Sequence, residues 1–217
     1  MTLSEENYLK TVYHLTGVSD GEVSTNAIAE MIETKASSVT DMLKKLAEKG
    51  LVNYKKYQGV SLTDSGRLSA KMIVRKHRLW EVFLVEKLDF AWDEVHDIAE
   101  QLEHIKSEQL INKLDDFLGN PTQDPHGDPI PDRHGKIAKT EKMLLSELLK
   151  DQSGLCVGVK DSSAEFLKYL DKNQIALGSR IEVVLKEDFD ASMKIRVGTN
   201  EIVISSKIAG NLFVKKV

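Results

Sequence analysis

The sequence predicts a mainly α-helical protein that ends in a small β-rich domain. Three observations lead to this expectation: apolar residues recur at helical spacings before residue 121, short apolar runs typical of strands follow residue 180, and all four prolines lie between Pro121 and Pro131. Because proline lacks a backbone donor and disfavours helix in the residue before it, the proline-rich segment divides the chain.

The composition is that of an ordinary globular protein: the 217 residues are 41% hydrophobic and 29% charged. No apolar run approaches the roughly 18 residues that suggest a membrane span, so we expect no membrane insertion. Residues 1–6 lack the basic segment and apolar core of a secretory signal. Cys156 is the only cysteine, so no intrachain disulfide can form and a cytoplasmic location is expected.

The net charge of −4 hides two blocks of opposite sign. Residues 35–78 contain eleven Lys or Arg and three acidic residues, a net charge of +8, whereas residues 81–124 contain twelve acidic residues and three lysines, a net charge of −9. Two solvated faces would explain this pattern. Alternatively, the first block binds a polyanion and the second a cation.

The basic block favours a winged helix-turn-helix. A helix capped by Ser24 or Thr25 is separated by a break near residues 33–36 from a second helix that Gly50 is placed to end. Residues 51–63 then alternate like a hairpin, which would form the wing. The second helix of such a motif can enter the major groove of DNA.

Hydroxyl and basic side chains gather at the start of this second helix and at the hairpin tip, where phosphates bind well. Ala36 could contact a thymine methyl group. The simpler role of Ser37 is to cap its helix, and Asp41 opposes tight phosphate contact. The expected DNA-contacting residues are Lys35, Ala36, Ser37, Ser38, Thr40, Lys44, Lys55, Lys56 and Tyr57.

The acidic block has the spacing of metal ligands. His96, Glu100, Glu103 and His104 would share one face of a helix, His77 and Glu81 lie one turn apart, and His126 lies beside Asp124 in the proline-rich loop. Clustered carboxylates repel one another unless a cation neutralises them, although a single surface acid is usually only solvated. Oxygen and imidazole ligands suit Mn(II) or Fe(II), whereas thiolates would favour zinc.

After the proline-rich segment the pattern changes to short strands. Residues 139–150 fit either a short helix or a strand and its connection. Four later runs, separated by Gly-containing turns, predict strands of a small β-barrel: residues 181–185, 193–197, 201–204 and 212–214.

The joined pattern resembles the metal-dependent transcriptional repressors of the diphtheria-toxin-repressor and manganese-transport-regulator family, over essentially the whole chain. The matching segments are residues 6–13, 37–40, 62–66, 75–79, 95–97, 102–104, 125–127 and 169–172. The resemblance implies an N-terminal winged helix-turn-helix in residues 1–66, a central helical dimerisation and metal-binding domain in residues 67–140, and a C-terminal SH3-like β-barrel in residues 141–217.

The resemblance also implies two metal sites. The primary site would use Asn7 with Glu100, Glu103 and His104, with His77 added as in the two-metal manganese regulators. The ancillary site would use Glu81 and His96 or His126, with Asp124 and Glu165; His77 could belong here instead.

Three positions depart from the family pattern. Asn7 stands where iron sensors have methionine and manganese sensors have aspartate, and Glu100 stands where iron sensors usually have cysteine. Lys10 occupies a position that is acidic in the two-metal proteins, which argues against the same two-metal geometry. Manganese is therefore the first choice and iron the alternative.

The implied function is that of a cytoplasmic homodimer, not an enzyme, that binds a pseudo-palindromic operator in double-stranded DNA when Mn(II) or Fe(II) is abundant. Two other functions compete. A two-metal hydrolase would leave the winged helix unexplained and would need a base or nucleophile motif. A winged-helix protein that senses nothing would leave the acidic block merely solvated.

Overall fold

The structure, a computed structural model, describes residues 1–17, 21–55, 58–138 and 141–217. The described chain forms two compact units. The first unit comprises Met1–His77, Glu100–Lys113 and Pro131–Ile137, and the second comprises Arg78–Ala99, Leu114–Ile130 and Ala138–Val217.

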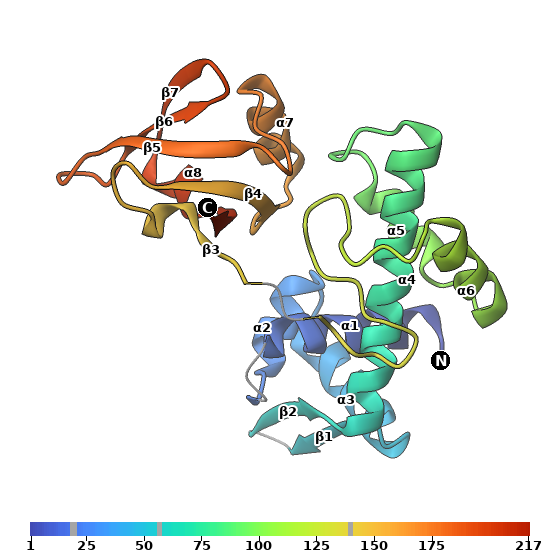
Figure 1. Cartoon of the computed structure of the whole chain (residues 1–217). Helices are drawn as coiled ribbons and strands as arrows, with labels where there is room; N and C mark the ends of the chain where they lie inside the picture. The colour runs from blue at the N-terminus through green and yellow to red at the C-terminus, as the bar shows by residue number, and fades with distance from the viewer. Residues whose placement is uncertain (18–20, 56–57, 139–140) are drawn as a thin grey trace. The chain divides into compact units, whose positions relative to one another are not determined.

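The N-terminal part of the first unit is a helix-turn-helix followed by a two-stranded hairpin (Figure 1). Its elements are α1 (Leu3–Thr16), α2 (Thr25–Met31), α3 (Ala36–Glu48), β1 (Val52–Lys55) and β2 (Gly59–Leu62). Thr2 and Glu5 form a capping box at the start of α1, and the Ser24 hydroxyl accepts a hydrogen bond from the Ala27 N–H at the start of α2. The expected winged helix-turn-helix is thus confirmed.

The sequence also placed the end of α3 correctly. The helix stops at Glu48, and Gly50 follows with a φ of +68°, a left-handed conformation that glycine adopts at little cost. The apolar faces of the helices and hairpin pack into one core, in which Leu9, Ile28, Leu43 and Val60 are completely buried. This core fixes α3 and the hairpin on α1, because all three bury their apolar residues together.

Three further helices follow the hairpin: α4 (Asp64–Leu88), α5 (His96–Leu102) and α6 (Glu108–Phe117). The division between the two units falls inside α4, after His77. Within the second unit, Leu84 of α4 packs with Val95 and with Ala99 of α5. No helix in the described ranges is both long enough and apolar enough to cross a bilayer.

The C-terminal part of the second unit is an antiparallel six-stranded sheet with the strand order β3-β8-β4-β5-β6-β7. Its elements are β3 (Met143–Leu144), a 3-10 turn (Leu145–Glu147), β4 (Ser153–Val159), α7 (Ala164–Lys172), β5 (Arg180–Lys186), β6 (Met193–Val197), β7 (Asn200–Ile204), α8 (Ser206–Ala209) and β8 (Leu212–Lys216).

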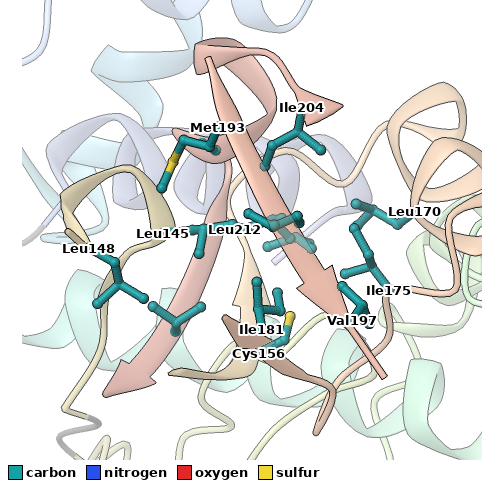
Figure 2. Packing of buried hydrophobic residues seen from close by; sticks show 14 of the residues in the cluster. Leu145, Leu148, Cys156, Leu170, Ile175, Ile181, Met193, Val197, Ile204 and Leu212 are labelled. Carbon is teal, nitrogen blue, oxygen red and sulfur yellow. The ribbon is translucent and has the colours of Figure 1, made fainter. Parts of the chain in front are cut away.

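Side chains from the strands, the 3-10 turn and α7 meet in one apolar interior (Figure 2). Ile181, Leu170 and Leu212 are completely buried there, and Cys156 is 2% exposed. Burial raises the pKa of the Cys156 thiol, so this side chain acts as a small apolar group of the core.

The fold class expected from the sequence, mainly α with a small β domain of SH3-like type, is confirmed. Residues 139–150, for which the sequence allowed either a short helix or a strand and its connection, contain the short strand β3 and the 3-10 turn. Its first two residues, 139 and 140, lie outside the described part of the chain.

Candidate metal centres and DNA-binding surface

Helix α1 directs a row of polar side chains toward the segment that follows α5. Glu6 and Lys10 are four residues apart, so they lie on one face of α1, with Asn7 in the same turn as Glu6. All three residues belong to the first unit, as do His77, Glu100, Glu103 and His104. We call these seven residues the α1 cluster.

Glu103 lies at the centre of the α1 cluster and has no exposed surface. Lys10 Nζ lies 2.7 and 2.8 Å from its two carboxylate oxygens, and His77 Nδ1 lies 2.7 Å from Oε2. Burial alone would raise the pKa of Glu103, but the hydrogen bond from His77 and the charge of Lys10 outweigh it and lower the pKa. The carboxylate is therefore held in its charged form.

His104 is held from α1 by Glu6. The Nδ1 atom of His104 lies 2.7 Å from Oε2 of Glu6, while its Nε2 atom faces Glu103 Oε1 at 3.8 Å. A Nδ1–H that donates to Glu6 leaves the lone pair on Nε2, which is the tautomer that a histidine ligand needs. Glu6 is thus an orienting residue that the sequence analysis missed.

Asn7 carries an unusual polar atom. Its Oδ1 is buried and has no hydrogen-bond partner among the described residues. A buried carbonyl oxygen without a partner is costly, and a divalent ion would satisfy it. Together with the Glu103 carboxylate and the His104 imidazole, this amide provides the oxygen and nitrogen donors that suit Mn(II) or Fe(II).

One expectation about this region is wrong. His96, Glu100, Glu103 and His104 were expected on one helix face, but α5 ends at Leu102. Glu103 and His104 lie in the turn that follows, so of the four residues His96 and Glu100, one turn apart in α5, still share a helix face. The contacts of Glu103 and His104 with α1 and α4 stabilise this turn in place of another helical turn.

A second group of candidate ligands lies in the second unit. Glu81, Asp124 and His126 each offer a ligand atom, and these atoms lie within 4.8 Å of one another. His96 Nδ1 is 3.5 Å from a Glu81 oxygen, although the His96 side chain is 57% exposed. We call these four residues the loop cluster.

The proline-rich loop shapes the loop cluster through Asp124. One carboxylate oxygen of Asp124 accepts hydrogen bonds from the backbone N–H groups of His126 and Asp128, each at 2.9 Å, while Arg78 Nε lies 3.3 Å from the other. Gly127 has a φ of +82°, and a Cβ added there would lie 2.1 Å from the Val157 carbonyl oxygen. The tight turn therefore requires glycine.

The charges of the loop cluster depend on its burial. Burial, reinforced by the Glu81 charge, raises the pKa of Asp124 to about 6. Burial would lower the pKa of His126. The hydrogen bond to Glu81 and the negative charge of Glu81 outweigh burial and raise the pKa of His126 to about 9. His126 Nε2 lies 2.8 Å from the Trp92 carbonyl oxygen, so Nδ1 faces Glu81.

The remaining predicted ligand, Glu165, is exposed on α7 and is not in the group of converging atoms around Glu81. His77, which the sequence assigned to either site, is hydrogen-bonded to Glu103 in the α1 cluster.

The predicted DNA-contacting residues lie on one helix and one hairpin. Lys35 is the N-cap residue of α3, so Ser37 is not its cap. Most of the set is exposed, namely Lys35, Ala36, Ser37, Ser38, Lys44 and Lys55. Thr40 is half-buried and donates to the Ala36 carbonyl at 3.0 Å, and Lys44 lies 3.2 Å from Asp41. Lys56 and Tyr57 lie outside the described residues.

Comparison with known protein families matches nearly the whole chain in three parts. Residues 1–60 match the iron dependent repressor N-terminal DNA-binding domain, residues 63–132 match the iron dependent repressor metal-binding and dimerisation domain, and residues 143–216 match the FeoA domain.

Individual relatives agree. The HTH-type transcriptional regulator MntR of Oceanobacillus iheyensis is 36% identical over 103 residues, which are 48% of this chain and 69% of that protein. The iron-dependent repressor IdeR of Mycobacterium leprae is 36% identical over 104 residues, 48% of this chain and 44% of that protein.

The chain is also similar to a solved structure described as a manganese-dependent transcriptional repressor in complex with manganese. The TM-score is 0.87 at 36% identity, and the match covers 98% of this chain and 100% of the other. Such proteins are DNA-binding repressors rather than enzymes, which argues against a two-metal hydrolase. With its winged helix, its clustered acids and histidines and its C-terminal FeoA domain, the chain belongs to the family of metal-dependent transcriptional repressors.

Proposed function

We propose that this chain is a repressor activated by Mn(II), with Fe(II) as the alternative ion, and that it binds a pseudo-palindromic operator in double-stranded DNA as a homodimer. The buried Oδ1 atom of Asn7 is the observation that supports metal activation most directly, because it lacks a partner among the described residues. It lies on α1, whose neighbouring polar side chains already contact Glu103 and His104.

The primary site in this proposal is the α1 cluster, with Asn7, Glu100, Glu103 and His104 as ligands, His77 beside them, and Glu6 orienting His104. A bound divalent ion would supply the positive charge that the carboxylates require. Because α1 shares a core with α3, residues that hold α1 also fix the position of the recognition helix.

The ancillary site in this proposal is the loop cluster of Glu81, Asp124 and His126, with His96 beside Glu81. Its donors are again carboxylate and imidazole groups. Glu165, exposed on α7, is left out of this set.

Manganese is favoured over iron because of the donors that the chain offers. Both clusters provide oxygen and nitrogen ligands, while the only cysteine is buried in the core of the C-terminal sheet. Soft ligands would favour Fe(II) and later metals, and neither cluster contains one. Relatives named for manganese and for iron both match this chain, and the donor set is the feature that favours Mn(II).

On the DNA side, we propose that the start of α3 reads the major groove and that the hairpin between β1 and β2 binds phosphates. In a dimer, two such helices meet successive major grooves about 34 Å apart, or a multiple of this spacing. An operator with inverted half-sites would match this symmetry.

The test begins with selection of binding sites from random double-stranded DNA by the full chain in Mn(II). Binding to the selected site is then titrated with Mn(II), Fe(II), Zn(II) or chelator. We expect inverted half-sites, loss of specific binding in chelator, and half-maximal binding at a Mn(II) concentration within the range found for free Mn(II) in cells. Equal binding with and without chelator would overturn the proposal and favour a winged-helix protein that senses no metal.

A further inference from the structure

One face of α4 borders a cavity of about 540 Å³ in the first unit. Four side chains of the helix line it, at spacings that place them on the same helical face: Leu68, Met72, Arg75 and Lys76. The other walls come from Glu6 of α1 and from the segments 105–111 and 133–134. The volume lies within the range of roughly 300–1,000 Å³ that is typical of small-molecule sites.

Part of the cavity wall is apolar. Leu68 and Met72 of α4 face it together with Ile105 and with Ile111 of α6. Leu68 is 47% exposed, whereas Ile111 is only 3% exposed and belongs to the base of the wall. An apolar body that entered the cavity would remove these side chains from water, which is favourable.

The rest of the wall carries an excess of positive charge. Its charged residues are four basic and two acidic ones: Arg75, Lys76, Lys106, Arg133, Glu6 and Glu108. With His134 neutral, the excess is two positive charges. Such a cavity favours an anion over a neutral or cationic molecule of the same shape.

Lys76 is placed to bind the charged group of such a molecule. Its side chain is only 15% exposed, and the carboxylate oxygen that it contacts among the described residues, Oε2 of Glu6, is 3.9 Å away, which is longer than a hydrogen bond. That oxygen already lies 2.7 Å from Nδ1 of His104. The Lys76 ammonium group has therefore lost most of its water without a close anionic partner from the described residues, and a ligand carboxylate would provide one.

We infer that this cavity binds a small organic anion with an apolar body, of the class of medium-chain carboxylic acids. The carboxylate pairs with Lys76, and the chain lies against Leu68, Met72 and Ile105. Among the described residues that line the cavity, none is a proposed metal ligand. The inference thus goes beyond the proposed function and adds a second effector, an organic acid, to the metal ion.

The experiment is calorimetric titration of the full chain, with and without Mn(II). The probe is sodium octanoate. Three comparison compounds separate its features: 1-octanol has the chain without the charge, whereas sodium acetate and inorganic phosphate have the charge without the chain. The variants are Lys76→Met and Lys106→Glu. The matched control is Lys87→Met, because Lys87 lies on the same helix, is 38% exposed and is not among the residues that line the cavity.

We expect one octanoate per chain, with a Kd of about 1 mM or lower for a molecule of this size and at least tenfold tighter binding than any comparison compound. The affinity should be similar with and without Mn(II). Lys76→Met should weaken octanoate binding about tenfold or more, because a charge-assisted hydrogen bond is lost, and should leave octanol binding unchanged. Lys106→Glu should weaken octanoate binding at low salt and less so at high salt. Lys87→Met should have no effect.

Several results would overturn the inference. Absence of octanoate binding would mean that the cavity is closed or covered in the assembled protein. Equal affinities for octanoate and octanol, or for octanoate and acetate, would show that charge or the apolar wall contributes nothing. Binding only in the presence of Mn(II) would assign the carboxylate to the metal ion. If circular dichroism shows that Lys76→Met does not fold, Lys106→Glu decides, since Lys106 is exposed: an unchanged octanoate affinity at low salt would contradict the inference.

Discussion

The imidazole of His77 and the carboxylate of Glu103 are joined by a 2.7 Å hydrogen bond across 26 residues of sequence. Glu103 is completely buried, and Lys10 Nζ also donates hydrogen bonds to both of its carboxylate oxygens. The Glu103 side chain therefore connects the turn after α5 to Lys10 of α1 and to His77 of α4. Its loss should affect the folding of the metal-free protein as well as metal binding.

Glu103→Ala should lower the free energy of unfolding by about 3 kcal/mol in chelator, because it leaves the buried Lys10 charge without its main partner. Urea unfolding in chelator measures this change in the free energy of unfolding. The control is Glu100→Ala: that side chain is 44% exposed and makes one contact at 3.2 Å, so screening by solvent limits its effect to about 0.5 kcal/mol. Equal losses in the two variants would mean that the Lys10–Glu103 pair contributes little to stability.

Glu100→Cys should shift activation from Mn(II) toward Fe(II) or Co(II), because it replaces a hard oxygen donor by a thiolate. Asn7→Asp should instead tighten Mn(II), because it adds a charged oxygen at the same reach. The measurement is the concentration of each metal at half-maximal operator binding. If Glu100→Cys leaves the ratio of the Mn(II) and Fe(II) midpoints unchanged, the choice of metal is made by other residues.

Lys55→Ala should weaken binding to all DNA sequences alike and should reduce the slope of log affinity against log salt by about 1, the effect of losing one phosphate contact. Lys55 is exposed at the end of β1. Lys150→Ala is the control, since Lys150 is an exposed lysine of the second unit. A change in sequence preference at constant salt slope would show that the hairpin reads bases instead.

The winged helix-turn-helix could be predicted because its signals are local. Apolar spacing, the Ser24 cap and a glycine placed after α3 all lie within a few residues of the structure they determine. By contrast, β4 was not recognised as a strand. Its residues include Gly154 and Gly158, and glycine weakens the strand pattern even where neighbouring strands hold the backbone in place.

Most candidate ligands could be named from residue type and spacing, whereas Asn7 and Glu165 were named only through the family resemblance. The partners of these side chains could not be named from the sequence. Nothing local in the sequence shows that Glu6 orients His104 or that Lys10 reaches Glu103, because these contacts span 98 and 93 residues. For the same reason the end of α5 at Leu102 was missed: the next residues are compatible with helix, and tertiary contacts place them in a turn.

The stability of the metal-free protein should fall as the pH rises from about 7 to about 10. The pKa of His126 is raised in the folded state to about 9, mainly because Glu81 outweighs the cost of burial. A raised pKa stabilises the fold fully below the unfolded value of about 6.5, and this contribution is lost as the pH passes the folded value. Thermal unfolding in chelator tests this. His126→Asn should remove most of the decline, and an identical decline in that variant would assign it to other groups.

Gly127→Ala should weaken metal binding at the loop cluster by about tenfold or more, because loss of the geometry around a ligand has effects of this size. A Cβ at this position would lie 2.1 Å from the Val157 carbonyl oxygen and 2.4 Å from Gly158 Cα, so the backbone that carries Asp124 and His126 has to shift. The control is Gly178→Ala, which has the same φ of +82° but no atom within 4 Å of the new Cβ. Both substitutions should cost about 1 kcal/mol of backbone strain, and only Gly127→Ala should also lose metal. Urea unfolding of the two variants in chelator measures the backbone strain. Mn(II) titration measures the effect of moving the backbone that carries Asp124 and His126. Equal Mn(II) affinities would show that the loop cluster tolerates movement of this turn, or that Asp124 and His126 do not bind the ion.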